Sequence, residues 1–132
     1  MTDTLQQAAA LRAAFDVIEE SYEFMLAYAA QGRKHEMAEG AGESQIRQYL
    51  RRMLAALDEC STAVAGGIGG RDGAAFAERF RGDIAVARSV VSLLLAQPSI
   101  SSEMVDNSNG LIALRAFLTD VFFVDQVVLP PR

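Results

Sequence analysis

The most regularly spaced chemical groups in the chain are four carboxylates near its start, Asp16, Glu19, Glu20 and Glu23. Relative positions of zero, three, four and seven place them on one side of a helix, where like charges repel by roughly 0.2–0.5 kcal/mol per pair. If the chain folds back near residue 38, a basic strip of Arg47, Arg51 and Arg52 faces this acidic strip. Weak surface ion pairs account for this pattern better than a carboxylate cluster for a metal ion.

The single histidine, His35, lies in the string HEMAE, which resembles part of a zinc motif. That motif needs a second histidine four residues later, and Glu39 occupies this position. Helical bundles with two metal ions use Glu-x-x-His pairs, but Gly32 stands three residues before His35. We therefore expect neither a metal ion nor another cofactor.

Two further patterns are weak candidates for nucleophilic or phosphate chemistry. Cys60 lies on an apolar helical seam with no histidine near it in sequence, which is typical of an inert buried thiol. The segment GGIGGRDG, residues 66–73, has the glycines to approach a phosphate, and a following helix would offer free amides. It lacks the lysine and hydroxyl residue of a P-loop, and Asp72 adds negative charge, so a turn between helices is the preferred interpretation.

Asp120 and Asp125 interrupt an otherwise apolar run, and we expect at least one of them to be shielded from water. A shielded carboxylate needs a partner or a raised pKa. Arginines of a preceding helix, Arg79, Arg81 or Arg88, are the candidate partners. The alternative is an acid that contacts a ligand.

Apolar side chains repeat at alternating intervals of four and three along three segments, which predicts three packed helices. The first runs from Thr4 to Gln31, with Thr4 and Gln7 as a capping box, and its seam is Leu11, Phe15, Ile18, Tyr22, Met25 and Ala29. The second is capped by Ser44 and runs to about Gly66, with the seam Ile46, Leu50, Met53, Leu57, Cys60 and Val64. The third is capped by Asp72 and ends before Pro98, with the seam Phe76, Phe80, Ile84, Ala87, Val91 and Leu94.

Two connecting segments are polar. Residues 32–44 carry three glycines and no apolar period, so we expect residues 33–43 to be the most mobile internal segment and dispensable for the fold. Residues 99–110 leave two alternatives open. A helix could begin near Ser101 and continue to Leu129, or residues 107–110 could hold a break.

The run from Leu111 to Leu129 is apolar on nearly every side of a helix and must therefore be buried. Charges at Arg115, Asp120 and Asp125 exclude a membrane span, because each would cost about 2.5–3.5 kcal/mol at membrane depth. Phe117, Val121, Val124 and Val128 share the side expected to close the bundle, while Leu118, Phe122 and Leu129 spread onto a second side. We expect a two-fold homodimer through this helix, with the candidate interface residues Phe117, Leu118, Phe122, Asp125 and Leu129.

The chain as a whole has the composition of one globular domain, residues 1–132, with 51% hydrophobic and 22% charged residues. A net charge of −5 opposes binding to nucleic acid. The lone cysteine and the absence of a basic, apolar leader favour a cytoplasmic location. No segment alternates like a strand, so the predicted fold is all-α, an antiparallel four-helix bundle.

Three functional hypotheses follow. The first is a non-catalytic homo-oligomeric bundle that acts through protein contacts as an accessory or adaptor subunit. The second is a bundle whose interior binds a small apolar or aromatic ligand, with the candidate pocket Tyr22, Met25, Tyr49 and Met53. The third is an enzyme, which comes last because no set of catalytic residues stands out by its spacing.

Overall fold

The computed structural model describes residues 2–132, and its regular elements are helices. They are α1 (Thr2–Ala29), α2 (Gln45–Val64), α3 (Ala74–Leu95), α4 (Ser102–Asn109), α5 (Ile112–Phe123) and a short π-helical turn, η1 (Val124–Val128). No strand forms within this part of the chain, so the prediction of an all-α fold is confirmed for it.

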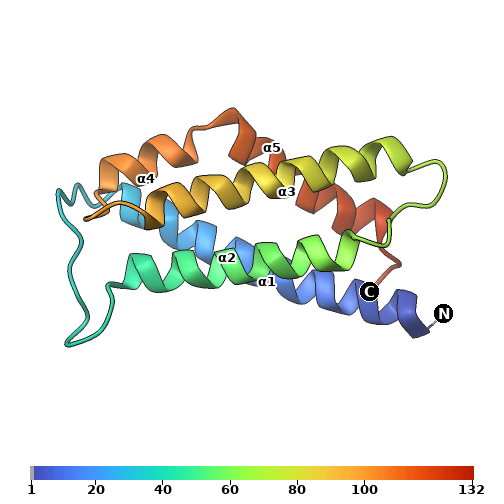
Figure 1. Ribbon diagram of the computed structural model, residues 1–132, viewed down its shortest axis with the longest axis horizontal. Coiled ribbons are helices and arrows are strands. Elements are labelled where there is room, and N and C mark those ends of the chain that lie inside the picture. The colour runs from blue at the N-terminus through green and yellow to red at the C-terminus, as the bar shows by residue number, and fades with distance from the viewer. Residues whose placement is uncertain (1) are drawn as a thin grey trace.

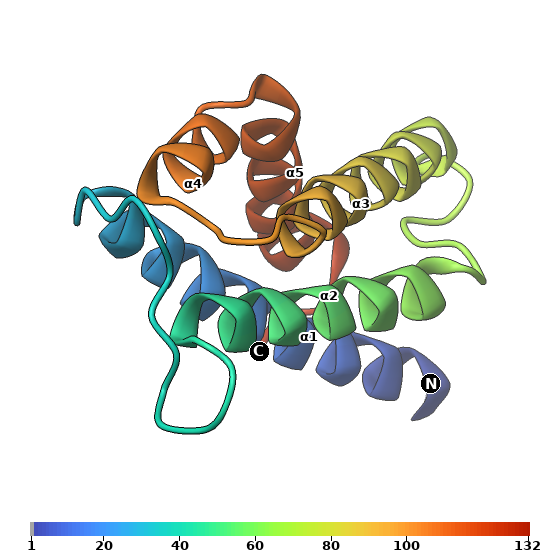
Figure 2. The same ribbon diagram turned by 60° about the vertical axis from the view of Figure 1, so that its left-hand side comes forward.

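The helices form two layers, with α1 and α2 side by side in one and α3, α4 and α5 in the other (Figures 1 and 2). The three long helices alternate in direction along the chain, and α4 and α5 together lead back toward the end of the molecule where the chain starts (Figure 1). α1 packs on α2 and α4, α2 packs on α3, and α5 packs mainly on α3. The buried apolar side chains of all five helices form one core.

The predicted seams of the second and third helices point into this core. All six seam residues of α2 are buried, as are the α3 seam residues from Phe80 to Leu94. Phe76, the first residue of the α3 seam, is half-buried and packs its ring on Phe80 and Phe123. The four-three alternation was therefore sufficient to orient these two helices.

The seam of α1 differs from the prediction in its second half. Leu11, Phe15, Ile18 and Met25 are buried, but Tyr22 and Ala29 are only half-buried. Their places in the core are taken by Ser21 and Tyr28. An α-helix drifts by about 20° per seven residues relative to a strict four-three repeat, and over 28 residues the buried side moves by one position.

Of the three helix caps predicted, Ser44 is correct, and Thr4 and Asp72 are wrong. The Ser44 hydroxyl accepts from Arg47 N at 3.4 Å, and that of Ser101 accepts from Met104 N at 3.2 Å. The third helix instead begins after Gly73, whose backbone stands at the N-cap with no side-chain bond, so Asp72 is not the cap. Thr4 lies inside α1, and the amide of its predicted partner Gln7 donates to the carbonyl of Ala63.

Residues 99–110 combine the two alternatives left open by the sequence. A helix does begin after Ser101, but it ends at Asn109, and Gly110 and Leu111 separate α4 from α5. The Asn109 amide donates to the carbonyl of Met25 at 3.2 Å, which fixes the end of α4 against α1. The described chain therefore has five α-helices where the sequence predicted four, because a polar contact to α1 replaces the continuation of the helix.

The connection between α1 and α2 is anchored through its first half, contrary to the expectation for residues 33–43. Arg33 and Ser102 exchange two hydrogen bonds: the Ser102 backbone N donates to Arg33 O, and the Arg33 backbone N donates to the Ser102 side-chain Oγ, both at 2.8 Å. Glu36 accepts from Ile100 N at 2.8 Å and from Arg47 Nε and Nη2 at 2.8 Å each. Arg47 also donates to the carbonyls of Leu95 and Gln97. This Glu36–Arg47 network of hydrogen bonds joins the loop to both layers.

Candidate functional site

The first candidate site is a groove between α1 and α5, called the α1–α5 groove. It has a volume of about 460 Å³ and is lined by Glu19, Tyr22, Glu23, Arg115, Leu118, Thr119 and Phe122. The groove forms because α1 packs on α2 and α4 while α5 packs mainly on α3, which leaves these two helices as walls without close packing between them. Phe122 is 58% exposed at its edge.

The charges of the α1–α5 groove are separated between its two walls. Glu19 and Glu23 stand on the α1 wall and Arg115 on the α5 wall, and within the described residues none of the three forms an ion pair. Burial, followed by the negative charges of Asp16, Asp125 and Glu23, raises the pKa of Glu19. The acidic wall therefore favours an added positive charge.

The five candidate interface residues are divided between the groove and the core. Leu118 and Phe122 line the α1–α5 groove. Phe117, at 0% exposure, and Leu129, at 7%, are buried inside the chain and present no surface to a partner. Phe117 stacks on Phe80 of α3 with ring centroids 6.2 Å apart. Leu129 turns inward because the π-helical turn ends there with its N–H bonded to Val124 O at 2.9 Å.

Asp125, the fifth candidate, belongs to a contact that holds the end of the chain, the C-terminal clamp. Arg12 of α1 donates through Nε to Asp125 Oδ1 at 2.7 Å and through Nη2 to the carbonyls of Asp125 and Pro130 at 3.1 and 2.6 Å. Arg132 lies 3.3 Å from the same carboxylate. The Arg12 hydrogen bond holds the pKa of Asp125 below its ordinary value despite partial burial, and Arg132 adds to this effect. The partner of Asp125 is thus none of the arginines expected from the sequence.

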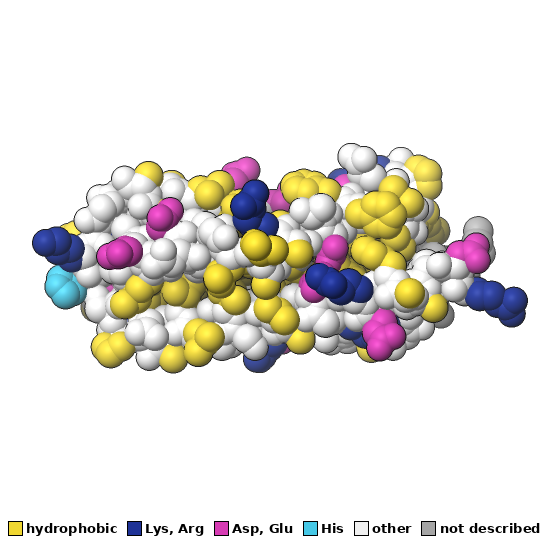
Figure 3. Space-filling model, turned by 90° about the horizontal axis from the view of Figure 1, so that it is seen from above, with side chains coloured by type: hydrophobic (Ala, Val, Ile, Leu, Met, Phe, Trp, Pro, Cys, Tyr) yellow, Lys and Arg dark blue, Asp and Glu magenta, His cyan; other side chains and the backbone are white. Residues whose placement is uncertain are grey.

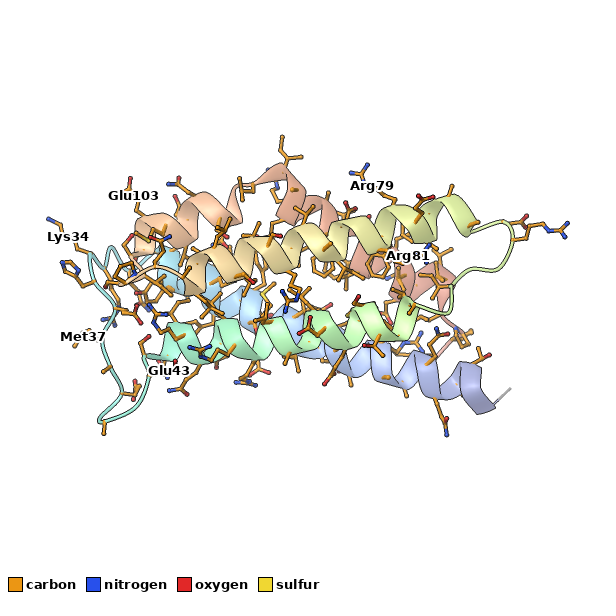
Figure 4. The ribbon with its side chains drawn as sticks, in the orientation of Figure 1. Lys34, Met37, Glu43, Arg79, Arg81 and Glu103 are labelled. Carbon is orange, nitrogen blue, oxygen red and sulfur yellow. The ribbon has the colours of Figure 1, made fainter. Side chains whose placement is uncertain are left out.

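Asp120 faces a second carboxyl group, that of Asp83 on α3. Asp83 is 9% exposed and accepts from Arg79 Nε at 3.0 Å, while Asp120 Oδ2 is buried and has no hydrogen-bond donor in the described structure. Burial, then the hydrogen bond and charge of Asp83, raise the pKa of Asp120 to about 7. Arg79 and Arg81 leave α3 on opposite sides, so only Arg79 reaches this Asp83–Asp120 pair (Figure 4).

The carboxyl pair resembles the proton-sharing acids of some active sites, but its surroundings do not. The raised pKa of Asp120 keeps this carboxyl partly protonated near neutral pH, so it can donate a hydrogen bond to Asp83. Neither carboxyl lines the α1–α5 groove. The pair joins α3 to α5.

The predicted ligand pocket is not assembled around one cavity. Tyr22 lines the α1–α5 groove, whereas Tyr49 stacks on Phe24 with ring centroids 4.2 Å apart. Positions 22 and 24 project from opposite sides of a helix, so the two tyrosines lie on different sides of α1. Met25 and Met53 are both completely buried in the core.

The basic strip of α2 pairs mainly with the preceding loop and only once with α1. Arg47 binds Glu36 at 2.8 Å, and Arg51 binds Glu43 at 2.7 Å. The acidic strip of α1 is reached by one contact, in which Arg52 lies 3.4 Å from Glu20, with both side chains about half exposed. The sequence indicated the complementary charges but missed the loop carboxylates, because ion pairs across a loop have no periodic signal.

The other sequence candidates lie apart from one another. Cys60 is fully buried, and burial together with the nearby charge of Glu59 raises the pKa of its thiol to about 12, which removes its nucleophilic form at neutral pH. His35 is exposed in the loop before α2. Across the described residues, no three His, Cys, Asp or Glu side chains are grouped as metal ligands.

Comparison with known proteins adds no assignment. The chain matches no protein-family model, no curated protein and no solved structure. None of the helices in residues 2–132 has the length and apolar character that crossing a membrane requires.

Proposed function

We propose that this protein is a non-catalytic helical bundle that acts through protein contacts, as an accessory or adaptor subunit, and that it forms a homodimer through the α1–α5 groove. In this proposal α4 and α5 together take the place of the fourth helix of an antiparallel bundle. The observation that carries the proposal is an apolar groove edged by unpaired charges of opposite sign on its two walls.

The charge pattern favours a second copy as the occupant. The apolar floor and edge are formed by Tyr22, Leu118 and Phe122, with the acids on the α1 side and Arg115 on the α5 side. A two-fold axis parallel to the groove places the basic wall of each copy opposite the acidic wall of the other. Two copies would then bury both Phe122 rings and pair four acids with two arginines, which supports self-association without another partner.

Light scattering at micromolar concentration tests this proposal, with Phe122→Glu as the disrupting variant. We expect a dimer for the unmodified protein and a folded monomer for Phe122→Glu. Leu5→Glu is the matched control, because Leu5 is 59% exposed on α1, lies outside the α1–α5 groove and receives the same charge. A monomeric parent protein, or equal effects of both variants, would contradict the proposal.

Charge reversal tests the orientation of the two copies. Arg115→Glu should weaken the dimer about tenfold or more, since it places acid against acid across the groove. Combining it with Glu19→Arg and Glu23→Arg should restore dimerisation, because the pairs are then re-formed with reversed sign. If the triple variant stays monomeric while circular dichroism shows intact helices, the proposed axis is wrong.

A further inference from the structure

The end of α4 combines a reactive pair of residues with a single anchoring contact. Asn109 is followed by Gly110, and a glycine has no side chain to obstruct attack of its backbone nitrogen on the asparagine before it. Asn109 is 8% exposed, and its Nδ2 donates to the carbonyl of Met25 at 3.2 Å. Within residues 2–132 this is the only hydrogen bond between the last turn of α4 and α1.

The folded conformation blocks the reaction of this pair. Deamidation begins when Gly110 N attacks Cγ of Asn109. In the closed structure Gly110 N donates to Asp106 O at 3.1 Å, and Asn109 Nδ2 is held by the Met25 carbonyl. The attack therefore requires both hydrogen bonds to break and the last turn of α4 to unwind.

Unsatisfied polar groups in the last turn of α4 favour such an opening. The hydroxyl of Ser108 and Oδ1 of Asn109 are buried without a hydrogen-bond partner in the described structure. Each costs about 1–3 kcal/mol, and opening returns both to water. α4 has only 8 residues, and the chain after it is exposed, with Ile112 at 81%. A short helix with these properties opens at a lower free energy than the whole domain.

We propose that Asn109 is a site of spontaneous deamidation, that the reaction occurs through local opening of α4, and that the product keeps the end of α4 detached from α1. Gly110 N forms a bond to Asn109 Cγ and gives up its proton, the bond from Cγ to Nδ2 breaks, and Nδ2 leaves with that proton as ammonia. Water then adds to one of the two carbonyl carbons of the cyclic imide and breaks the bond of that carbon to Gly110 N. The products are aspartate and isoaspartate, and no oxidant or reductant takes part.

The product carboxylate cannot restore the lost contact. It carries no proton at neutral pH to donate to the Met25 carbonyl, so acceptor oxygens would face each other. It would also lie at the C-terminal, negative end of the α4 dipole, on a helix whose other charges are the acids Glu103 and Asp106. Acidic side chains are visible over α4 when the molecule is seen from above (Figure 3). Closing the turn would bury an unpaired charge, so the change is one-way.

Peptide mass spectrometry of the full chain, incubated at neutral pH with and without urea, tests the reaction. The exchange of an amide for a carboxyl group changes the peptide mass, and fragmentation separates Asn109 from Asn107, the other asparagine of the chain. We expect Asn109 to convert about 10- to 100-fold more slowly in the folded chain than in urea. Equal rates would mean that the fold does not protect Asn109. A folded rate more than about 1,000-fold slower would mean that only global unfolding exposes it, and either result would overturn the proposal.

Gly110→Ala tests the route through the cyclic imide. Gly110 has a φ of −82°, and an added Cβ would meet only Asn107 O at 3.6 Å and Asp106 O at 3.7 Å, so the variant should fold like its parent. The methyl group hinders the attack, and conversion of Asn109 in urea should slow about tenfold or more. Gly82→Ala, where an added Cβ meets nothing within 4 Å, is the control and should leave the rate unchanged. An unchanged rate in Gly110→Ala would exclude attack by the backbone nitrogen.

Asn109→Asp reproduces one product and tests the release of α4. We expect the amides of residues 105–110 to exchange rapidly at neutral pH while those of α2 and α3 stay protected. Asn107→Asp is the matched control, because Asn107 is exposed on the same helix and receives the same charge, and it should leave α4 protected. Neither Asn109 nor Gly110 lines the α1–α5 groove, so these results do not depend on dimerisation. Protection of α4 in Asn109→Asp equal to that in Asn107→Asp would contradict the release.

Discussion

At the residue scale, the Asp83–Asp120 pair makes stability depend on pH in a direction unusual for a carboxyl group. The pKa of Asp120 is about 7, against an ordinary value of 3.8. Between these values the folded protein retains a proton that the unfolded chain has released. The pair's contribution to the free energy of unfolding is therefore fully present below about pH 4 and decreases as the pH rises to about 7.

Asp120→Asn should remove this dependence. The amide can donate a hydrogen bond to Asp83 at every pH, so the variant should be at least as stable as the parent above about pH 7, with the advantage vanishing toward about pH 4. Urea unfolding at several pH values measures the effect. The control, Asp125→Asn, should instead lower stability at neutral pH, because the pKa of Asp125 is lowered by Arg12. A parallel pH profile for Asp120→Asn and parent would refute the shared proton.

The C-terminal clamp gives a second prediction at this scale. Arg12 is 14% exposed and reaches three acceptors from one planar group, which the point charge of lysine cannot do. Arg12→Lys should lower the free energy of unfolding by about 1–2 kcal/mol. Arg52→Lys is the matched control, since the half-exposed Arg52–Glu20 contact should contribute nothing measurable. Chemical unfolding measures both, and equal effects would show that the clamp does not stabilise the fold.

At the element scale, the Glu36–Arg47 network divides the loop between α1 and α2 into an anchored and a free part. Burial alone would raise the pKa of Glu36, but hydrogen bonds from Arg47, Ser44 and Ile100 outweigh it and lower the pKa. The Glu36–Arg47 network therefore stabilises the fold at neutral pH, and this stabilisation is lost as the pH falls through the lowered pKa of Glu36. Glu39 and Gly42, further along the loop, form only a local turn with each other.

Removing the carboxylate should therefore matter more than shortening the loop. Glu36→Ala leaves the half-buried Arg47 without its ion-pair partner and should cost about 2–3 kcal/mol in the free energy of unfolding. Glu43→Ala, which breaks the exposed pair with Arg51, should leave stability unchanged. Hydrogen exchange should show slow amides at Arg33 and Glu36, which donate to Ser102 and Ser99, and fast ones at residues 38–41. Fast exchange throughout residues 33–42 would mean that the Glu36–Arg47 network does not persist in solution.

The helices were predictable from sequence to the extent that their seams are periodic. The seam from Ile46 to Val64 was placed correctly because every residue in it is apolar and the helix is short enough for the four-three repeat to hold. The break at Gly110 was not decided, because it depends on the Asn109 amide reaching the backbone of α1, a contact 84 positions away in sequence. Asp83 and Arg12 were missed for the same reason, since their partners are visible only after folding.

The candidate site was predictable only in part. Leu118 and Phe122 were assigned to an exposed side of the last helix, and they line the α1–α5 groove. Their neighbour Tyr22 had been assigned to the interior, because the drift of α1 relative to its repeat is small over each turn and accumulates over the whole helix.

At the scale of the whole molecule, two adjacent residues of α5 have different expected roles, Val121 in folding and Phe122 in association. Val121 is 1% exposed in the single core that joins both layers, whereas Phe122 is 58% exposed. Val121→Glu should abolish cooperative unfolding and most of the helical circular dichroism, because the free-energy cost of burying an unpaired carboxylate in the core exceeds the free energy of unfolding of a small domain. Phe122→Glu should keep both. If Val121→Glu remains folded, the two layers are less tightly joined than their packing indicates.

The π-helical turn at Val124–Val128 amounts to one residue more than an α-helix would use to cover the same length, since its closing bond joins Leu129 N to Val124 O. In evolutionary terms it is equivalent to a single-residue insertion. Deleting the exposed Gln126 would restore an α-helical turn in which Leu129 N still bonds Val124 O, so Leu129 should stay in the core and Arg132 beside Asp125. A relative shorter by this one residue could therefore keep the same C-terminal contacts.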